Sequence, residues 1–285
     1  MQKVTSVKAL RDIVQQWKQQ GLCIAFVPTM GNLHAGHIKL VTEAKKKADR
    51  IVVSIFVNPT QFGVGEDFKS YPRTEELDQE LLNAASADLL FLPTVLEMYP
   101  QQSKTVVSVA DLSQSHCGAH RVGHFDGVAT VVAKLFNIVQ PDLAVFGEKD
   151  FQQLLVIKQM VKDLNMAIDI IGVATERESD GLAMSSRNAY LSKQQRLVAV
   201  QMYLSLCKAK ESVLSAEQGM STTESQQQKC LENFGFKVDY FSICRNDNLQ
   251  QATDTDEQIV ILVAAKLGST RLIDNICFNR NPTIN

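Results

Sequence analysis

Two histidines three residues apart, His34 and His37, have the type and spacing that most directly indicate chemistry. In the first turn of a helix, residues three apart share a face, so both imidazoles would point to the same side. Gly36 between them has no Cβ, which leaves room for a flat ring beside the backbone. A helix N-terminus also offers free N–H groups and a partial positive charge to anions. This segment therefore predicts a site for a nucleotide and its phosphates.

A metal site is the alternative interpretation of paired histidines. No acidic residue follows at zinc-protease spacing, and no His-Glu-x-x-His occurs. His116, His120 and His124 are four residues apart. Gly118 and Gly123 interrupt the helix that a metal-binding stripe would need. We therefore expect no metal site built from protein ligands alone.

The elements that must hold the two histidines alternate between strands and helices. The apolar run 22–27 predicts a buried strand closed by Pro28, and apolar residues at helical spacing follow from Ile38. Further strands are expected at 51–57, 89–92, 143–146 and 168–174, and helices around 7–20, 77–82, 128–139 and 151–164. This alternation predicts an α/β domain over residues 1–174, with a doubly wound, Rossmann-like parallel sheet.

The pattern changes after residue 174. Ser192 is placed to cap a long helix over 193–214, and a second helix ends at Gly235. Strand-like runs follow at 236–243, 259–265 and 270–276. We therefore expect a smaller α+β domain over residues 175–285 with an antiparallel sheet.

Polar segments follow three of the predicted parallel strands, at 30–37, 58–61 and 147–150. Ligands of open α/β sheets bind at the carboxyl ends of strands, so these segments should converge. Lys149 offers a point charge to a phosphate. Ser185, Ser186 and Arg187, in a loop of the second domain, suit polyphosphate oxygens. Taken alone, each segment is equally explained as a solvated or capped turn.

Composition limits the partners. The 285 residues carry 29 basic and 31 acidic side chains and a formal charge of −2, without the basic clusters that nucleic-acid binding requires. The six cysteines include no Cys-x-x-Cys pair and are expected to be reduced thiols. The first eleven residues lack the apolar core of a signal peptide, and no apolar run is long enough to span a bilayer. We expect a cytoplasmic protein with no membrane partner.

Seven motifs together resemble one enzyme family. The His-Ala-Gly-His and Met-Ser-Ser-Arg segments are similar to the HIGH and KMSKS pair of the nucleotidyltransferase superfamily. The wider motifs resemble pantothenate synthetase, the pantoate–β-alanine ligase family, along the whole chain. These motifs are PTMGNLHAGH at 28–37, FVNPTQF at 56–62, YPRT at 71–74, GHFDGV at 123–128, FGEKDFQQ at 146–153, DGLAMSSRN at 180–188 and GSTRLIDN at 268–275.

The resemblance implies a reaction and a set of site residues. The family joins pantoate to β-alanine with ATP and magnesium through an enzyme-bound pantoyl adenylate, usually as a homodimer through the N-terminal domain. Gln61 and Gln153 match the glutamines that bind pantoate, Gln61 also reaching β-alanine, and His37 matches the family's proton donor. Arg121 and His124 match a segment on the substrate side of the family's site, and we do not count them among the main site residues. The implied ATP contacts are Met30, Gly31, Asn32, Leu33, His34, Ala35, Gly36, His37, Gly147, Glu148, Lys149, Asp150, Glu176, Met184, Ser185, Ser186 and Arg187.

The residue types support this chemistry independently. Attack of a carboxylate on the α-phosphorus needs no enzyme nucleophile, only in-line placement and donors for the developing charge. His34, His37, Lys149 and Arg187 are such groups, and we expect them to be catalytic. Magnesium would be carried largely by the nucleotide and water. Glu176 departs from the apolar residue frequent in the family, where a backbone group contacts adenine.

Three competing functions remain. Another nucleotidyltransferase that adenylates a phosphate acceptor should carry extra cations at its substrate end, where this chain has Asn58, Gln61 and Gln153. A relative of the tRNA synthetases would need a basic surface. A non-catalytic nucleotide sensor would not need phosphate donors in both domains. Release of AMP in the presence of pantoate, β-alanine and ATP would distinguish these functions.

Overall fold

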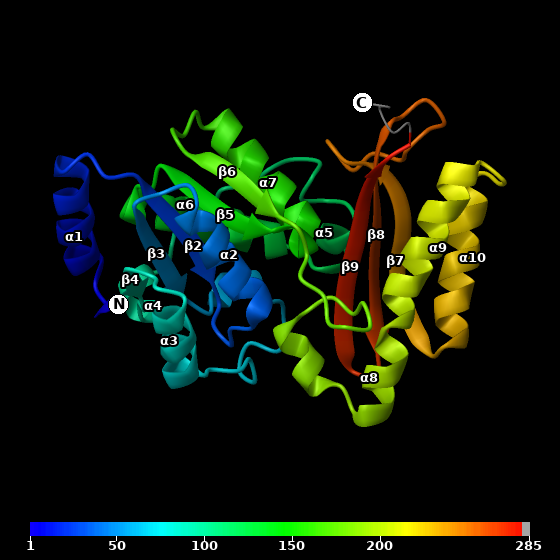
Figure 1. The fold of residues 1–285 in the computed structure, drawn as a ribbon, viewed down its shortest axis with the longest axis horizontal. Coiled ribbons are helices and arrows are strands. Elements are labelled where there is room, and N and C mark those ends of the chain that lie inside the picture. Colours follow the sequence, from blue (N-terminus) through cyan, green and yellow to red (C-terminus); the bar gives the residue numbers. More distant parts are fainter. Residues whose placement is uncertain (281–285) are drawn as a thin grey trace. The chain divides into compact units, whose positions relative to one another are not determined.

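A computed structural model describes residues 1–280, which divide into two compact units (Figure 1). The first unit contains residues 1–148 and 156–174, and the second contains residues 149–155 and the chain from Thr175 onwards. The sequence prediction assigns residues 149–155 to the first domain, but they group with the second unit. A hydrogen bond of 2.9 Å from Asn275 Nδ2 to the carbonyl oxygen of Lys149 is one reason.

The first unit is built on a six-stranded sheet in which every described neighbour pair is parallel. This arrangement confirms the doubly wound α/β fold expected from the sequence. The first strand was not predicted, because three residues are too few to show a period. In spatial order the strands are β1 (Gln2–Val4), β4 (Leu89–Phe91), β3 (Arg50–Ile55), β2 (Ile24–Thr29), β5 (Leu143–Gly147) and β6 (Asp169–Val173).

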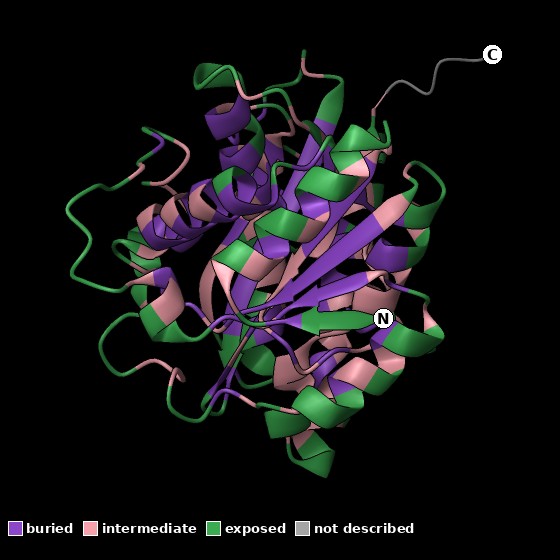
Figure 2. Ribbon diagram, turned by 90° about the vertical axis from the view of Figure 1, so that its left-hand side faces the viewer, coloured by how far each residue is buried: buried purple, intermediate pink, exposed green. Residues whose placement is uncertain are grey.

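Both faces of the central strand β2 are buried, and Figure 2 shows the buried strands in purple. Ala25 and Val27 belong to the same buried cluster as Val41 of helix α2 (Ala35–Lys45). Phe26 points to the other face, where its ring meets Phe136 of helix α6 (His124–Val139) edge-on at 6.3 Å. Burial on both sides explains why β2 is apolar throughout instead of alternating.

Short helices complete the first unit. The side chain of Ser6 accepts a hydrogen bond from Ala9 N at 3.3 Å, so it caps the first helix as expected. Two of the shorter helices, α4 and α5, were not predicted, since four residues show no helical period. The remaining elements are α1 (Val7–Gln19), η1 (Pro59–Gln61), α3 (Glu75–Ala84), α4 (Val95–Met98), α5 (Cys117–His120), η2 (Glu148–Asp150) and α7 (Phe151–Asp163), the last two crossing between the units.

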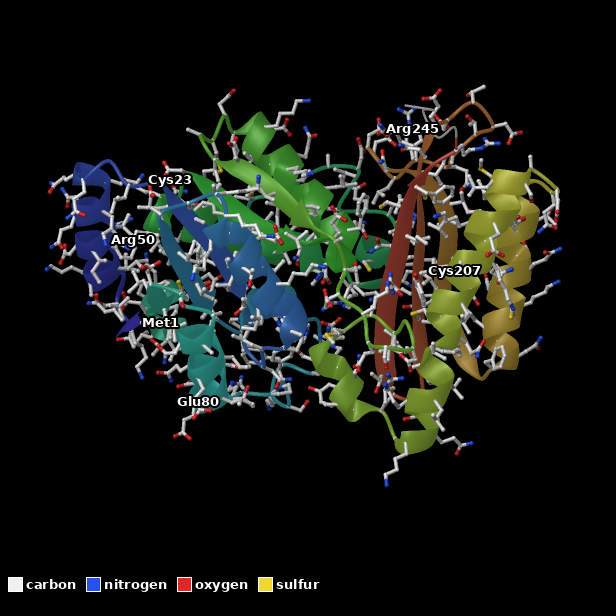
Figure 3. The ribbon with its side chains drawn as sticks, in the orientation of Figure 1. Met1, Cys23, Arg50, Glu80, Cys207 and Arg245 are labelled. Atoms are coloured by element: carbon white, nitrogen blue, oxygen red, sulfur yellow. The ribbon has the colours of Figure 1, made fainter. Side chains whose placement is uncertain are left out.

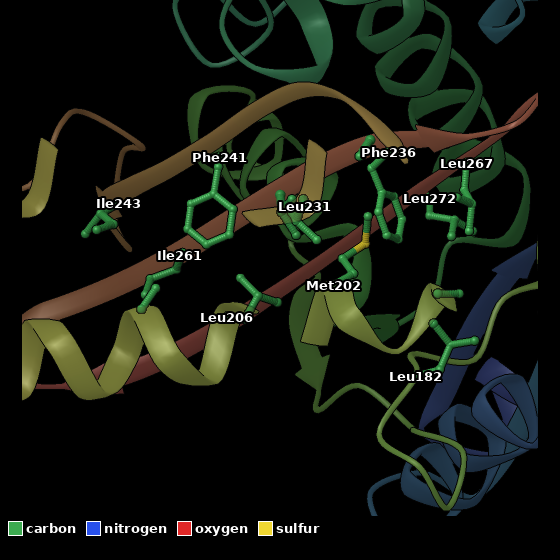
Figure 4. Packing of buried hydrophobic residues seen from close by; sticks show 14 of the residues in the cluster. Leu182, Met202, Leu206, Leu231, Phe236, Phe241, Ile243, Ile261, Leu267 and Leu272 are labelled. Atoms are coloured by element: carbon green, nitrogen blue, oxygen red, sulfur yellow. The ribbon is translucent and has the colours of Figure 1, made fainter. Parts of the chain in front are cut away.

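The second unit packs helices on a three-stranded antiparallel sheet, as the sequence indicates. Its core is formed by apolar side chains of the helices and strands, among them Met202, Leu206, Leu231, Phe241 and Ile261 (Figure 4). The elements are η3 (Ser186–Tyr190), α8 (Lys193–Ala199), α9 (Gln201–Ser215), α10 (Met220–Asn233), β7 (Phe236–Arg245), β8 (Gln258–Leu267) and β9 (Thr270–Asn279).

One helix prediction in the second unit is wrong. The single helix expected over 193–214 is divided at Val200 into α8 and α9. Neither proline nor glycine lies in this range, so no helix breaker announces the division. Leu197 is 76% exposed, whereas Ala199 and Met202 are buried in the core. Both segments nevertheless pack on the same core, to which Ala199, Met202, Leu206, Ala209 and Val213 belong.

All six cysteines are free thiols, as expected. They lie on separate elements in both units, and Figure 3 labels Cys23 and Cys207. Burial raises the pKa of the Cys244 thiol to about 12, so this residue behaves as a small apolar side chain.

Candidate active site

The predicted site in the first unit lies where the order of the parallel strands reverses. β2 pairs with β3 on one side and with β5 on the other. The segments that follow these three strands therefore leave the same edge of the sheet. This edge is where open α/β sheets bind ligands.

His34 and His37 form the first turn of α2. The Nδ1 atom of His34, the N-cap residue, accepts the backbone N–H of Gly36 at 3.2 Å. The Nδ1 atom of His37 accepts the backbone N–H of His34 at 3.3 Å, and the two ring centroids are 4.1 Å apart. A neutral imidazole whose Nδ1 accepts a hydrogen bond carries its proton on Nε2. The hydrogen-bond network therefore assigns both rings as Nε2–H donors.

A buried carboxylate in α3 holds the loop that leads into these histidines. The side chain of Asp78 is 1% exposed and accepts the backbone N–H groups of Asn32 and Leu33 at 2.9 and 2.8 Å. Thr74 Oγ1 donates to the same carboxylate at 3.1 Å. Asp78 thus satisfies two backbone donors that precede the helix start and fixes the approach of the chain to His34.

Polar side chains at the end of β3 form a buried network with this loop. Asn58 Nδ2 donates to Gln61 Oε1 and to the carbonyl oxygen of Gly127, both at 3.1 Å. The hydroxyl of Tyr99 donates to Asn58 Oδ1 at 2.9 Å, and burial raises the pKa of this phenol. Gln61 Nε2 lies 3.1 Å from Met30 Sδ. The amide of Gln61 is therefore oriented beside the histidine segment.

The backbone of Gln61 is held from its other side by α6. His124 Nδ1 lies 2.8 Å from the Gln61 carbonyl oxygen, and Arg121 Nη1 lies 3.0 Å from His124 Nε2. Both contacts are satisfied when His124 is neutral, donating through Nδ1 and accepting at Nε2. Arg121 makes two bonds of 2.6 Å to Glu66. Burial opposes ionisation of Glu66, but Arg121 outweighs it and lowers the pKa to about 2.

Lys149 and Gln153 lie where the chain enters the second unit. Lys149 belongs to η2, and its ammonium is 3.9 Å from the carboxylate of Asp150. Its carbonyl oxygen accepts Asn275 Nδ2. Gln153 follows in the first turn of α7 and is half-buried.

The Met-Ser-Ser-Arg segment is a tight turn in the second unit. Met184 N donates to the carbonyl oxygen of Glu176 at 2.9 Å, which closes the hairpin at 176–184 that leads into this segment. Ser185 Oγ accepts the backbone N–H of Arg187 at 3.3 Å and caps η3. The carbonyl group of Glu176, a residue expected to contact adenine through its backbone, is therefore engaged within the hairpin.

The structure brings together predicted residues within each unit. In the first unit, Met30 and Gln61 are in contact, and Gly31 to His37 continue from Met30 into α2. In this unit Gly147 ends β5 and Glu148 begins η2, whereas the predicted residues at 149–153 and 176–187 belong to the second. The binding and catalytic roles assigned to all of these residues stay predictions.

Sequence reasoning missed the residues that hold the site in place. Asp78 looks like an ordinary acidic residue of a first helical turn, which favours negative charge. Its partners are 45 and 46 positions away, so no local pattern reveals its role. Arg177 and Asp274 form a similar long-range pair. Among these supporting residues, only Asp274 and Asn275 could have been noticed in the sequence, because they end the motif at 268–275.

Within residues 1–280, no three His, Cys, Asp or Glu side chains are grouped so that they could hold a metal ion. His124 of the spaced histidines contacts Gln61 and Arg121 instead. Over the same residues, none of the helices is both long and apolar enough to cross a membrane.

Comparison with known proteins places the chain in a family. Residues 2–277 match the family model described as pantoate-beta-alanine ligase. Pantothenate synthetases of Shewanella loihica and Pseudomonas fluorescens are 55% and 54% identical, covering 98% and 97% of this chain and 100% and 97% of those proteins.

Two solved structures give the same result. Pantothenate synthetase of Thermus thermophilus matches with a TM-score of 0.92 at 43% identity, covering 99% of this chain and all of that one. Pantoate-beta-alanine ligase of Francisella tularensis, solved with beta-gamma ATP and beta-alanine, matches with a TM-score of 0.83 at 33% identity over 98% of each chain. With both sequence and fold matched from end to end, the chain belongs to the pantoate–β-alanine ligase family.

Proposed function

We propose that this chain condenses pantoate with β-alanine, using ATP, to give pantothenate, AMP and pyrophosphate. The reaction passes through an enzyme-bound pantoyl adenylate and belongs to the biosynthesis of coenzyme A precursors. The observation that carries the proposal is the histidine pair at the N-terminus of α2, whose Nδ1 atoms both accept backbone N–H groups. Two Nε2–H donors at a helix N-terminus suit the oxygens of a polyphosphate.

The first step is adenylation. A carboxylate oxygen of pantoate attacks the α-phosphorus of ATP, the bond from that phosphorus to the β-phosphate bridge breaks, and pyrophosphate leaves. Charge develops on the phosphate oxygens in the transition state, where preorganised donors are most effective. We assign this role to His34, His37, Lys149 and Arg187. His37 is the proton donor that the family resemblance implies.

The second step is amide formation. The amine of β-alanine attacks the acyl carbon of the adenylate, AMP leaves, and the amine nitrogen loses a proton. We assign pantoate binding to Gln61 and Gln153, and Gln61 also to β-alanine. Support comes from the burial of Gln61 and from the bonds that orient its amide, because a preorganised amide discriminates hydroxyl and carbonyl groups.

Magnesium is proposed to enter with ATP. Its preferred ligands here are phosphate oxygens and water, so no protein side chain is assigned to it. When bound, the ion would neutralise charge on the phosphates. It would act beside the side-chain donors assigned above.

We also propose a cytoplasmic homodimer that associates through the first unit. The first unit exposes Val95 by 45%, Leu96 by 71% and Val106 by 64%. Val95 and Val106 line one cavity of about 500 Å³ together with Tyr99. Grouped apolar surface of this kind is typical of an association site. A Val106→Asp variant that sediments like the wild type at the same concentration would argue against this surface.

The reaction is tested by isotope exchange. With pantoate and ATP alone, the enzyme should exchange labelled pyrophosphate into ATP and release little AMP. Addition of β-alanine should release AMP in step with pantothenate. Exchange that requires β-alanine, or a wild-type enzyme that forms no AMP with all three substrates, would contradict the proposed mechanism.

A further inference from the structure

A buried ion pair within the second unit joins strand β9 to the hairpin at 176–184, which leads directly into the Met-Ser-Ser-Arg segment. Arg177 donates to both carboxylate oxygens of Asp274 at 2.7 and 3.0 Å, and the Asp274 side chain is only 2% exposed. Burial raises the pKa of Asp274, and the guanidinium of Arg177 opposes that rise, so the pair with Arg177 favours the charged form of Asp274 against its burial. Such a paired charge is costly to break, because its partner is left buried.

The remaining donors of Arg177 fix the hairpin itself. Its guanidinium also bonds the carbonyl oxygens of Gly181 at 3.1 Å and of Asn275 at 3.1 Å, and lies 3.9 Å above the ring of Tyr203. Gly181 has a φ of +97°, and a Cβ there would lie 2.5 Å from the Tyr203 ring. Only glycine fits at this position. Arg177 thus anchors the hairpin at 176–184, and the segment Met184 to Arg187 continues directly from the base of this hairpin.

The next residue of β9 holds the lysine segment. Asn275 follows Asp274, and its backbone N–H donates to the Asp274 carboxylate at 2.7 Å. Asn275 Nδ2 donates to the carbonyl oxygen of Lys149 at 2.9 Å. Two adjacent residues of one strand therefore contact two segments that are far apart in the chain.

We infer that Asn275, together with the neighbouring Arg177–Asp274 ion pair, is a positioning element that sets Lys149 and the Met184–Arg187 turn for phosphate chemistry. This inference rests on the proposed function, which assigns both segments to ATP. None of the three residues touches the reacting atoms in this role. β9 is an edge strand that pairs with β8 along its whole length, from Thr270 to Asn279, so it is a rigid support. A displacement of about 1 Å at a reacting group can cost about 10²-fold in rate.

The test is a double-mutant cycle on the full-length enzyme. Asn275→Asp keeps the side-chain size but removes the Nδ2 donor that holds Lys149. Pantoate-dependent pyrophosphate exchange should fall about 10- to 100-fold in kcat/KM for ATP, whereas the affinity for adenosine, which lacks phosphates, should be retained. In an enzyme that already carries Lys149→Ala, Asn275→Asp should lower this kcat/KM by less than about threefold. Both substitutions act through the Lys149 side chain, so their effects should not add.

A second cycle tests the other half of the element. Arg177→Lys removes the planar guanidinium that donates two hydrogen bonds to Asp274. When Arg177→Lys and Arg187→Ala are combined, the loss of pyrophosphate exchange should be smaller than the product of the two single losses. Asp239→Asn is the matched control, since it weakens a partly buried ion pair with Arg271 on the same sheet, in which the Asp239 side chain is 13% exposed. The control should exchange within about twofold of the wild type.

The outcomes separate this inference from the proposed function. Absence of pantoate-dependent exchange in the wild type would overturn the proposed function. If the wild type exchanges normally but the double mutants in both cycles lose the product of the single losses, the positioning role is overturned and the proposed function stands. A parallel loss of adenosine affinity in Asn275→Asp, or an equal loss in Asp239→Asn, would show general structural damage and would also overturn it.

Discussion

Removal of the Asp78 carboxylate should both destabilise the protein and slow adenylation. This side chain accepts the backbone N–H groups of Asn32 and Leu33 and the hydroxyl of Thr74. It lies on α3, away from the histidines in sequence, yet it holds the two residues that precede His34. A substitution here therefore tests whether the loop before α2 must be held rigid for catalysis.

The magnitude follows from the number of bonds and from burial. A hydrogen bond to a charged group contributes about 1.5–3 kcal/mol, and an unsatisfied buried donor costs about 1–3 kcal/mol. Asp78→Ala leaves two backbone donors without their acceptor, so the free energy of unfolding should fall by about 3–5 kcal/mol. Asp78→Asn keeps one acceptor oxygen and presents an amide NH₂ in place of the other. The free energy of unfolding of Asp78→Asn should fall by about 1–3 kcal/mol.

Urea unfolding and single-turnover adenylation provide the two measurements. The midpoint should fall with an unchanged m-value, and Asp78→Asn should form pantoyl adenylate at least about tenfold more slowly than the wild type. Glu80→Gln is the control on the same helix, since Glu80 is exposed and labelled in Figure 3. Its stability should change by less than about 0.5 kcal/mol. An Asp78→Asn enzyme with wild-type stability and wild-type adenylation would refute the reasoning.

Three further substitutions test the assigned roles. His37→Ala should slow adenylation about 10²–10³-fold while pantoate still binds, and near-normal single-turnover adenylation would exclude that role. Gln153→Leu should raise the KM for pantoate and leave ATP binding, measured by calorimetry, roughly unchanged; equal losses would indicate a misassigned residue. Glu66→Gln removes the ion pair with Arg121 and should cost about 1–2 kcal/mol at pH 7, after a discount for solvent screening. The pKa of Glu66 is lowered from 4.5 to about 2 in the folded protein. The stability difference between the wild type and Glu66→Gln should therefore be largest above about pH 4.5 and disappear as the pH falls toward 2. A difference that grows in acid would contradict this assignment.

Local sequence was sufficient for most elements of the fold. The apolar run that contains β2 predicts a strand buried on both faces, and Ser6 predicts the start of α1. Strand ends in a parallel sheet meet at one edge, so the neighbouring placement of the segments after β2, β3 and β5 also followed. These features depend on residues close together in the chain.

Packing accounts for what the local pattern could not predict. The division between α8 and α9 occurs without a proline or glycine, so no residue of the segment marks it in the sequence. Gly127 shows the same limit at the site. A Cβ there would lie 2.4 Å from the carbonyl oxygen of Thr60, so only glycine lets α6 approach η1. In the sequence alone, this glycine lies just before the helix predicted over 128–139, and nothing there reveals the close approach.

Short motifs were enough to show which groups are present for catalysis, because the histidine pair, Lys149 and the Met-Ser-Ser-Arg segment lie in motifs with their own caps and turns. Motifs that run along the whole chain were likewise enough to indicate the family. How those groups are held is a property of the folded chain. The carboxylate of Asp78 meets its loop across 45 or more residues, and Asn275 meets Lys149 across 126. Hydrogen bonds between distant segments depend on the packed sheets that bring them together, and no local period or propensity encodes such a contact.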